Sequence, residues 1–125
     1  MTYLRIQIEG NKTAFAPGET VSGTASWQTD TPASIEVRLF WYTQGKGTRD
    51  VGFVNSSALQ QPAREGSHRF EFVLPDGPYS FSGKLISLGW ALEIVSQPSG
   101  ESDHVDLVVS PAGSEVIIGA HEGTS

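Results

Sequence analysis

The chain has 125 residues, a formal net charge of −6 at pH 7 and no cysteine. This length supports one domain, which can bury about two-thirds of its unfolded surface without covalent cross-links. The lack of cysteine excludes a disulfide scaffold and a thiolate-ligated metal site, and it fits a reducing compartment. Since no basic run offsets the acidic balance, we expect no nucleic-acid partner.

The N-terminal residues predict a strand. Apolar and polar side chains alternate over residues 3–9, which is typical of a half-buried strand. The segment lacks the basic region and apolar run of a secretory signal. No apolar window approaches the length of about 20 residues that a membrane-spanning helix needs. We therefore expect a cytoplasmic protein without direct membrane insertion, with a mature fragment of a longer secreted protein as the alternative.

A turn and a second strand follow. Pro17-Gly18 suits the centre of a type II turn, because Pro fixes the first dihedral and Gly accepts a positive φ. Over residues 20–28, small residues alternate with hydroxyl residues and the run ends in Trp27. We expect Trp27 to fill the space that these small residues leave.

The next strand carries an unusual polar face. Residues 35–42 alternate, with aliphatic residues and Trp41 on the inner side. A hairpin loop is expected over residues 43–50 and a weak return strand over residues 51–54. Residues 55–66 have no persuasive period and are expected to form a loop or an edge.

Residues 70–95 form the segment around which the other strands are expected to assemble. Two alternating apolar runs, 70–74 and 88–94, are separated by Pro75, Gly77 and Pro78. Because these residues interrupt a ladder, the two runs are expected to lie in different sheets. Trp90 shares a face with Leu88 and Leu92, so we expect it to be buried.

A last strand is expected over residues 105–109, ended by Pro111. The division predicted is a single domain over residues 1–110 and a tail over 111–125, in which 116–118 are a candidate extra strand. About seven or eight short strands with almost no helical periodicity predict an all-β, immunoglobulin-like antiparallel β-sandwich.

Two motif blocks give the chain a resemblance to a family. The first block is Phe15, Pro17-Gly18-Glu19 and Val21-Ser22-Gly23; the second is Leu74-Pro75, Pro78, Ser80-Phe81 and Gly83, followed by a strand centred on residues 88–92. Together they resemble the signatures of arrestin-like domains, over roughly residues 3–110. The sporulation-control proteins of bacteria share this fold. The matched residues are expected to determine the fold rather than to bind.

The resemblance implies a β-sandwich adaptor that binds receptor tails, sorting machinery or ubiquitin ligases, without a catalytic residue or a cofactor. Family members usually pair two sandwiches, whereas this chain has the length of one. The interdomain polar core and its activation switch therefore cannot be transferred to this sequence.

Candidates for catalysis or metal binding are few. The histidines, His68, His104 and His121, lack the close spacing of a metal site, so no metal or other cofactor is expected. His104 and Asp106 can share one strand face, where a carboxylate would orient an imidazole. A small enzyme with a site near this pair is therefore one alternative function, and a carbohydrate-binding sandwich is another.

The expected partner site lies on the polar face of the strand over residues 35–42. That face begins with Glu36 and then offers Arg38, Phe40 and Tyr42. Exposed aromatic residues beside an arginine suit a protein interface. We predict that Arg38, Phe40 and Tyr42 contact a protein partner or a second copy. In the alternative, residues 51–54 or 116–118 fold over these rings and make a satellite cluster.

Overall fold

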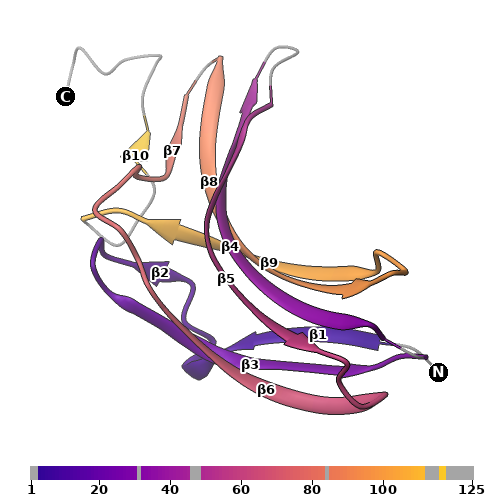
Figure 1. Ribbon diagram of the computed structural model, residues 1–125. Helices are drawn as coiled ribbons and strands as arrows, with labels where there is room; N and C mark the ends of the chain where they lie inside the picture. The colour runs from indigo at the N-terminus through magenta and orange to yellow at the C-terminus, as the bar shows by residue number, and fades with distance from the viewer. Residues whose placement is uncertain (1–2, 31, 46–48, 84, 112–115, 118–125) are drawn as a thin grey trace, which may run out of the picture.

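The computed structural model describes residues 3–30, 32–45, 49–83, 85–111 and 116–117. These residues form two β-sheets that pack face to face (Figure 1). In chain order the elements are β1 (Tyr3–Ile8), the short 3-10 turn η1 (Glu9–Asn11), β2 (Ala14–Phe15), β3 (Thr20–Gln28), β4 (Ser34–Gly45), β5 (Val51–Gln60), β6 (Glu65–Val73), β7 (Phe81–Ser82), β8 (Ile86–Gln97), β9 (Ser102–Val109) and β10 (Val116–Ile117).

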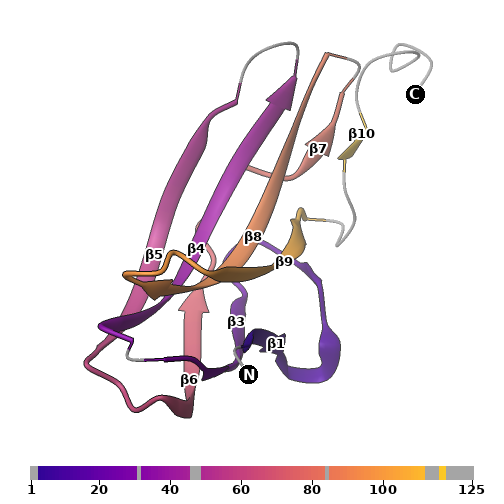
Figure 2. The same ribbon diagram turned by 90° about the vertical axis from the view of Figure 1, so that its right-hand side faces the viewer.

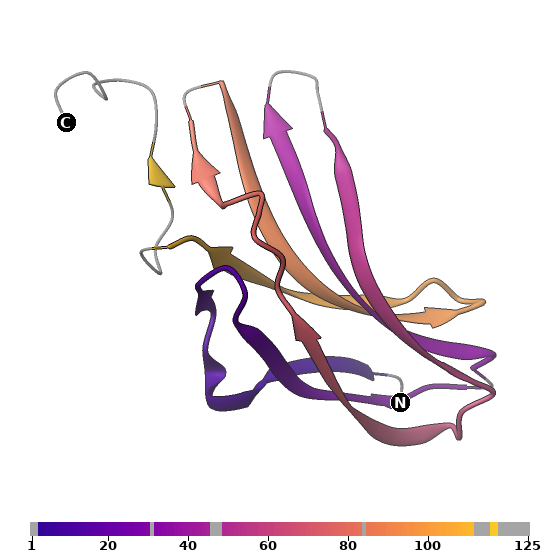
Figure 3. The same ribbon diagram turned by 60° about the vertical axis from the view of Figure 1, so that its left-hand side comes forward.

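The sheets differ in size. The small sheet has the order β1-β3-β6 and is antiparallel throughout. The large sheet follows the order β10-β7-β8-β4-β5, and β9 pairs with both β8 and β2. Pairing in the large sheet is antiparallel except for the two-residue contacts β2–β9 and β10–β7. Figure 2 and Figure 3 show β5 at the open side of the large sheet.

The core lies between the sheets and follows the predicted alternation. Phe70, Phe72 and Leu74 are buried, while Glu71 and Val73 are exposed. Trp90 has an exposed fraction of 0%, and its indole Nε1 donates to the carbonyl oxygen of Pro78 at 2.8 Å. The predicted burial of Trp90 is confirmed, as is the placing of the 70–74 and 88–94 runs in different sheets.

The crossing between β6 and β8 is fixed by Ser80. Its side chain is buried, and its Oγ accepts from the backbone N of Val109 at 3.0 Å. Its own backbone N donates to the Val109 carbonyl oxygen at 2.7 Å. Ser80 therefore satisfies backbone groups where the irregular crossing provides no ladder.

The two motif blocks meet in space. Glu19 N donates to Ala16 O at 3.1 Å, and Gly18 has φ of +84°, as a type II turn requires. The turn is tied to the end of β6, because Gly18 N donates to Leu74 O at 3.0 Å and Leu74 N donates to Glu19 O at 2.8 Å. The Pro-Gly-Glu block and the Leu-Pro block thus form one backbone junction.

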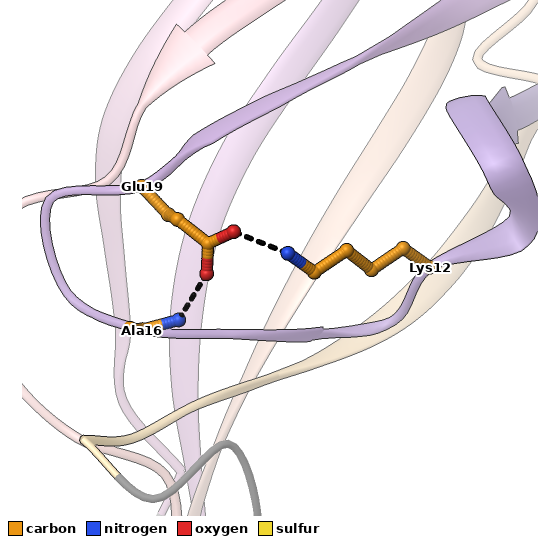
Figure 4. Close-up of polar contacts among 3 residues, drawn as sticks. All are labelled: Lys12, Ala16 and Glu19. Atoms are coloured by element: carbon orange, nitrogen blue, oxygen red, sulfur yellow. Dashed lines mark hydrogen bonds and ion pairs between the residues drawn. The ribbon is translucent and has the colours of Figure 1, made fainter.

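The Glu19 carboxylate closes this turn. It accepts a hydrogen bond from Ala16 N at 2.7 Å, and its other oxygen pairs with Lys12 (Figure 4). The hydrogen bond from Ala16, with that from Lys12, holds the pKa of Glu19 below its ordinary value near 4.5. The charged carboxylate is thus favoured by folding, and this contribution to stability is present above the ordinary pKa and is lost as the pH falls through the folded one.

We expect Glu19→Gln to reduce the acid sensitivity of the fold. The amide of the variant does not gain a proton in this pH range. The denaturation midpoint of Glu19→Gln should therefore fall less between pH 6 and pH 3 than that of the unmodified chain. Chemical denaturation at both pH values measures the difference. A residual acid effect should remain, because Arg69 and Ser22 also lower the pKa of Glu9. An identical loss of midpoint in both proteins would contradict the assignment.

Two expectations about the elements were wrong. The return strand β5 runs to Gln60 rather than ending at residue 54, and β6 begins at Glu65 rather than near residue 70. Pairing with β4 continues as far as Ser34↔Gln60. Backbone hydrogen bonds to β4 therefore stabilise a strand whose residues alone have little strand character. The register also shifts between Leu39 and Phe40, and this bulge disrupts the two-residue period on β5.

The role predicted for Trp27 was also wrong. The space over Gly23 is taken by Phe70, whose Cζ lies 2.8 Å from where a Cβ of residue 23 would be. Trp27 lies instead against Gly66 on the paired strand, and its Nε1 donates to Ala63 O at 2.9 Å. Gly23 of β3 therefore accommodates the Phe70 ring from the neighbouring strand β6.

Candidate functional site

The predicted partner residues lie on the outer face of the large sheet, away from the core. Strands β5, β4 and β8 lie side by side there (Figure 2), and β9 pairs with β8 on the side away from β4. One cross-strand row is Phe53, Phe40, Ala91 and Asp106; the next is Ser56, Arg38, Glu93 and His104. The sequence predicted the two pairs Arg38–Phe40 and His104–Asp106 as separate sites, and the sheet brings them onto one surface.

Three aromatic rings form the centre of this surface. The Phe40 ring lies 5.6 Å from that of Phe53 and 6.3 Å from that of Tyr42, in tilted arrangements. Phe53 is 64% exposed, whereas Phe40 and Tyr42 are half-buried. We call Arg38, Phe40, Tyr42 and Phe53 the outer-face patch.

Arg38 is positioned from three sides. Its guanidinium pairs with Glu36 at 2.9 Å and with Glu93 at 3.8 Å. It also lies over the Phe53 ring, 5.6 Å from the ring centroid. These contacts hold a half-exposed, planar cation against an aromatic face, which favours stacking and bidentate hydrogen bonding.

Tyr42 links the aromatic rings of the patch to Asp106 on β9. Its hydroxyl donates to Asp106 Oδ1 at 3.2 Å. The ring lies over Gly89 on β8, where an added Cβ would come within 2.8 Å of the tyrosine ring. Gly89 is therefore required for this position of Tyr42. An open hollow of about 380 Å³ adjoins the ring, lined by residues that include Phe40, Tyr42, Arg49, Glu93, His104 and Asp106.

The sequence did not single out Phe53, Glu93 or Gly89 as site residues. The alternation on residues 88–94 did place Gly89 and Glu93 opposite Trp90. It could not show that β8 lies beside β4 and that these residues therefore flank Tyr42 and Arg38. Phe53 lay in a strand too weak to assign a face.

The alternative, that residues 51–54 or 116–118 fold over the rings of Phe40 and Tyr42, holds only in part. β5 contributes Phe53, which packs against Phe40 at the edge of the surface. β10 pairs with β7, and β7 pairs with β8 on the side away from β4. The strand Val116–Ile117 therefore does not cover the patch, and residue 118 lies outside the described residues.

The histidines are dispersed. His68 lies on β6, with its Nε2 3.5 Å from Ser57 Oγ on β5, whereas His104 lies on β9. His121 falls outside the described residues. Within the described ranges no group of three His, Asp or Glu side chains could hold a metal ion.

No helix in those ranges has the length and apolar character needed to span a membrane.

Comparison with known proteins identifies the fold. No protein-family model and no curated protein sequence matches the chain. Among solved structures, the sporulation control protein Spo0M from Bacillus subtilis aligns with a TM-score of 0.60 and 23% identity over 87% of this chain. The fold is arrestin-like. The resemblance predicted from the two motif blocks is confirmed for the fold, and the chain spans about half the length of Spo0M, 49%.

Other solved structures are less similar. An alkylpurine DNA glycosylase, AlkC from Pseudomonas fluorescens, aligns at 12% identity over 87% of this chain and 30% of its own, with a TM-score of 0.45. A β-glucosidase from Listeria innocua aligns at 12% identity over 92% of this chain and 16% of its own, with a TM-score of 0.46. With TM-scores below 0.5, neither suggests an activity for this arrestin-like chain.

Proposed function

We propose that this chain is a non-enzymatic protein-binding adaptor domain and that the outer-face patch is its binding surface. The observation that carries the proposal is the cluster of three aromatic rings, Phe53, Phe40 and Tyr42, beside the guanidinium of Arg38. Aromatic residues and arginine are enriched at the energetic centres of protein interfaces.

The support of the patch suits a binding role. Its side chains project from paired strands rather than from loops, so few conformations are lost when a partner docks. Charged residues surround the rings, with Glu36 and Glu93 on one side and Asp106 on the other. Glu93 and Asp106 both line the hollow; Glu93 also pairs with Arg38, and Asp106 accepts a hydrogen bond from the Tyr42 hydroxyl. A partner segment with an apolar anchor beside a lysine or arginine would match this arrangement.

Phe40→Ser combined with Tyr42→Ser is expected to abolish partner binding without unfolding the chain. Truncating residues at an interface centre costs about 2 kcal/mol or more each, which is about 30-fold in affinity per residue, so the double variant should bind about 1,000-fold more weakly. The unmodified chain is used to purify proteins from its native cell. The dissociation constant of a captured, purified protein is then measured with each variant by calorimetry.

The matched control is Val73→Ser. Val73 is also 64% exposed, but it lies on β6 in the small sheet. This variant should bind like the unmodified chain. If the double variant unfolds, or if it binds as tightly as the Val73→Ser control, the assignment of the binding surface is wrong.

The hollow beside the outer-face patch also suits two other functions, carbohydrate binding and catalysis. It places the rings of Phe40 and Tyr42 next to His104 and Asp106, a combination that also suits a sugar ring. Binding of the chain to a glycan array, lost in the Phe40 and Tyr42 variant, would support a carbohydrate-binding module. A reproducible turnover lost in both His104→Ala and Asp106→Ala would instead support a small enzyme.

A further inference from the structure

The outer edge of β5 is an unusual sheet edge. β5 pairs with β4 on one side and ends the order of the large sheet on the other (Figure 2). Its ten residues, VGFVNSSALQ, include no charged residue and no proline. Charges, prolines and short strands are the devices by which proteins prevent pairing at an edge. β5 carries only a bulge.

The other long outer strands contrast with β5. β6 contains Glu65, Arg69 and Glu71, β9 contains Asp103 and Asp106, and β1 contains Arg5. Charge is thus present at each of these edges and absent from β5, in a chain whose net charge is −6. An uncharged edge is the part of an acidic chain that a second copy can approach without like charges in direct contact.

The bulge makes β5 complementary to itself. β4 pairs Leu39 with Asn55 and then Phe40 with Phe53, passing over Val54. If a second β5 follows the same pattern, antiparallel about a two-fold axis at Ser56, its Ala58 lies opposite Phe53 and its Leu59 opposite Gly52. Each pair joins a large residue to a small one on the same face of the sheet.

The backbone hydrogen bonding of Ser56 suits an added strand. The backbone N of Ser56 donates to the side chain of its own neighbour, Asn55 Oδ1, at 2.8 Å. An added strand could replace this local bond with a ladder bond.

We propose that two copies of this chain associate through their β5 strands, antiparallel about Ser56, to form one continuous sheet. The association does not depend on the adaptor function. Directly opposed residues of paired strands share a face, so both outer-face patches would lie on the same side of the joined sheet. The dimer would then present two binding surfaces to one partner assembly, with a gain in avidity.

Cysteine cross-linking tests the register. Directly opposed residues of an antiparallel pair have Cα atoms about 4.5–5.5 Å apart, within the range that a disulfide spans. The chain contains no cysteine, so Ser56→Cys introduces a unique thiol. We expect rapid formation of a disulfide-linked dimer under mild oxidation. The control is Ser67→Cys, an exposed position on β6, which should cross-link slowly.

A charge swap tests the dimer itself. Ser56→Lys alone and Ser56→Glu alone each oppose like charges on the two-fold axis, which should raise the dissociation constant of the dimer by about fivefold or more. An equimolar mixture of the two variants should restore association, which also shows that both are folded. Sedimentation equilibrium measures all three samples.

Three results would overturn the proposal. The unmodified chain could stay monomeric at all concentrations tested, or its dimer could be unaffected by Ser56→Lys. Alternatively, the dimer could be lost in the Phe40→Ser, Tyr42→Ser variant and kept in Ser56→Lys, which would place the contact on the outer-face patch. Loss of partner binding with an intact dimer would bear only on the adaptor function.

Discussion

Replacing Trp90 by alanine is expected to lower the free energy of unfolding by about 3 to 5 kcal/mol. The side chain is fully buried, and β4 and β9 flank it through the pairs Trp41↔Trp90 and Trp90↔Leu107. The substitution removes the apolar surface of the indole and leaves a cavity. It also deprives Pro78 O of its donor in the crossing between the sheets. Urea denaturation followed by circular dichroism measures the loss.

Trp90→Phe separates the two contributions. Phenylalanine restores much of the lost volume but cannot donate to Pro78 O, so this variant should be destabilised by about 1 to 3 kcal/mol. Its midpoint should lie between those of the unmodified chain and Trp90→Ala. A midpoint for Trp90→Ala equal to that of the unmodified chain would mean that the indole is not part of the core.

The alternation of side chains was sufficient to predict the layers. The apolar residues of β1, β3, β4, β6 and β8 face the core as their two-residue period indicates. Pro75, Gly77 and Pro78 correctly indicated that β6 and β8 belong to different sheets. β5 was missed beyond residue 54 because its strand state depends on pairing with β4 and because a bulge interrupts its period. Neither effect is visible in a local window.

The candidate site could be predicted only as fragments. The face of β4 that carries Arg38, Phe40 and Tyr42 follows from alternation along one strand. The neighbours of these residues depend on strand order, which alternation does not specify. Only the pairing of β4 with β5 and β8 places Phe53 against Phe40 and Glu93 beside Arg38. Whether this surface binds a protein stays a prediction.

The motif residues have a geometric explanation that sequence comparison alone does not provide. Glu19 closes a turn, Gly18 takes a positive φ, and both bond to Leu74 at the end of β6. Ser80 completes the hydrogen bonding of Val109. Each of these residues satisfies a backbone requirement of the junctions between strands. Gly23, the last residue of the first block, meets a different requirement, the close approach of its neighbours Gln7 and Phe70.

Gly23→Ala is expected to destabilise the chain by about 3 kcal/mol. Gly23 lies in the middle strand of the small sheet, between β1 and β6. A Cβ at this position would lie 2.1 Å from the backbone oxygen of Gln7 and 2.8 Å from Cζ of Phe70. Because the first contact is with backbone, a change of rotamer cannot relieve it, and β1 must move away from β3. Urea denaturation measures the effect.

Gly77→Ala is the control, since a Cβ at Gly77 would meet no atom within 4 Å. It should leave the midpoint nearly unchanged. A second variant distinguishes the two overlaps at Gly23. Adding Phe70→Leu to Gly23→Ala removes the ring but leaves the Gln7 oxygen in place, so it should not restore stability. Full recovery in that double variant would show that the Phe70 ring, and not the approach of β1, is what requires glycine at position 23.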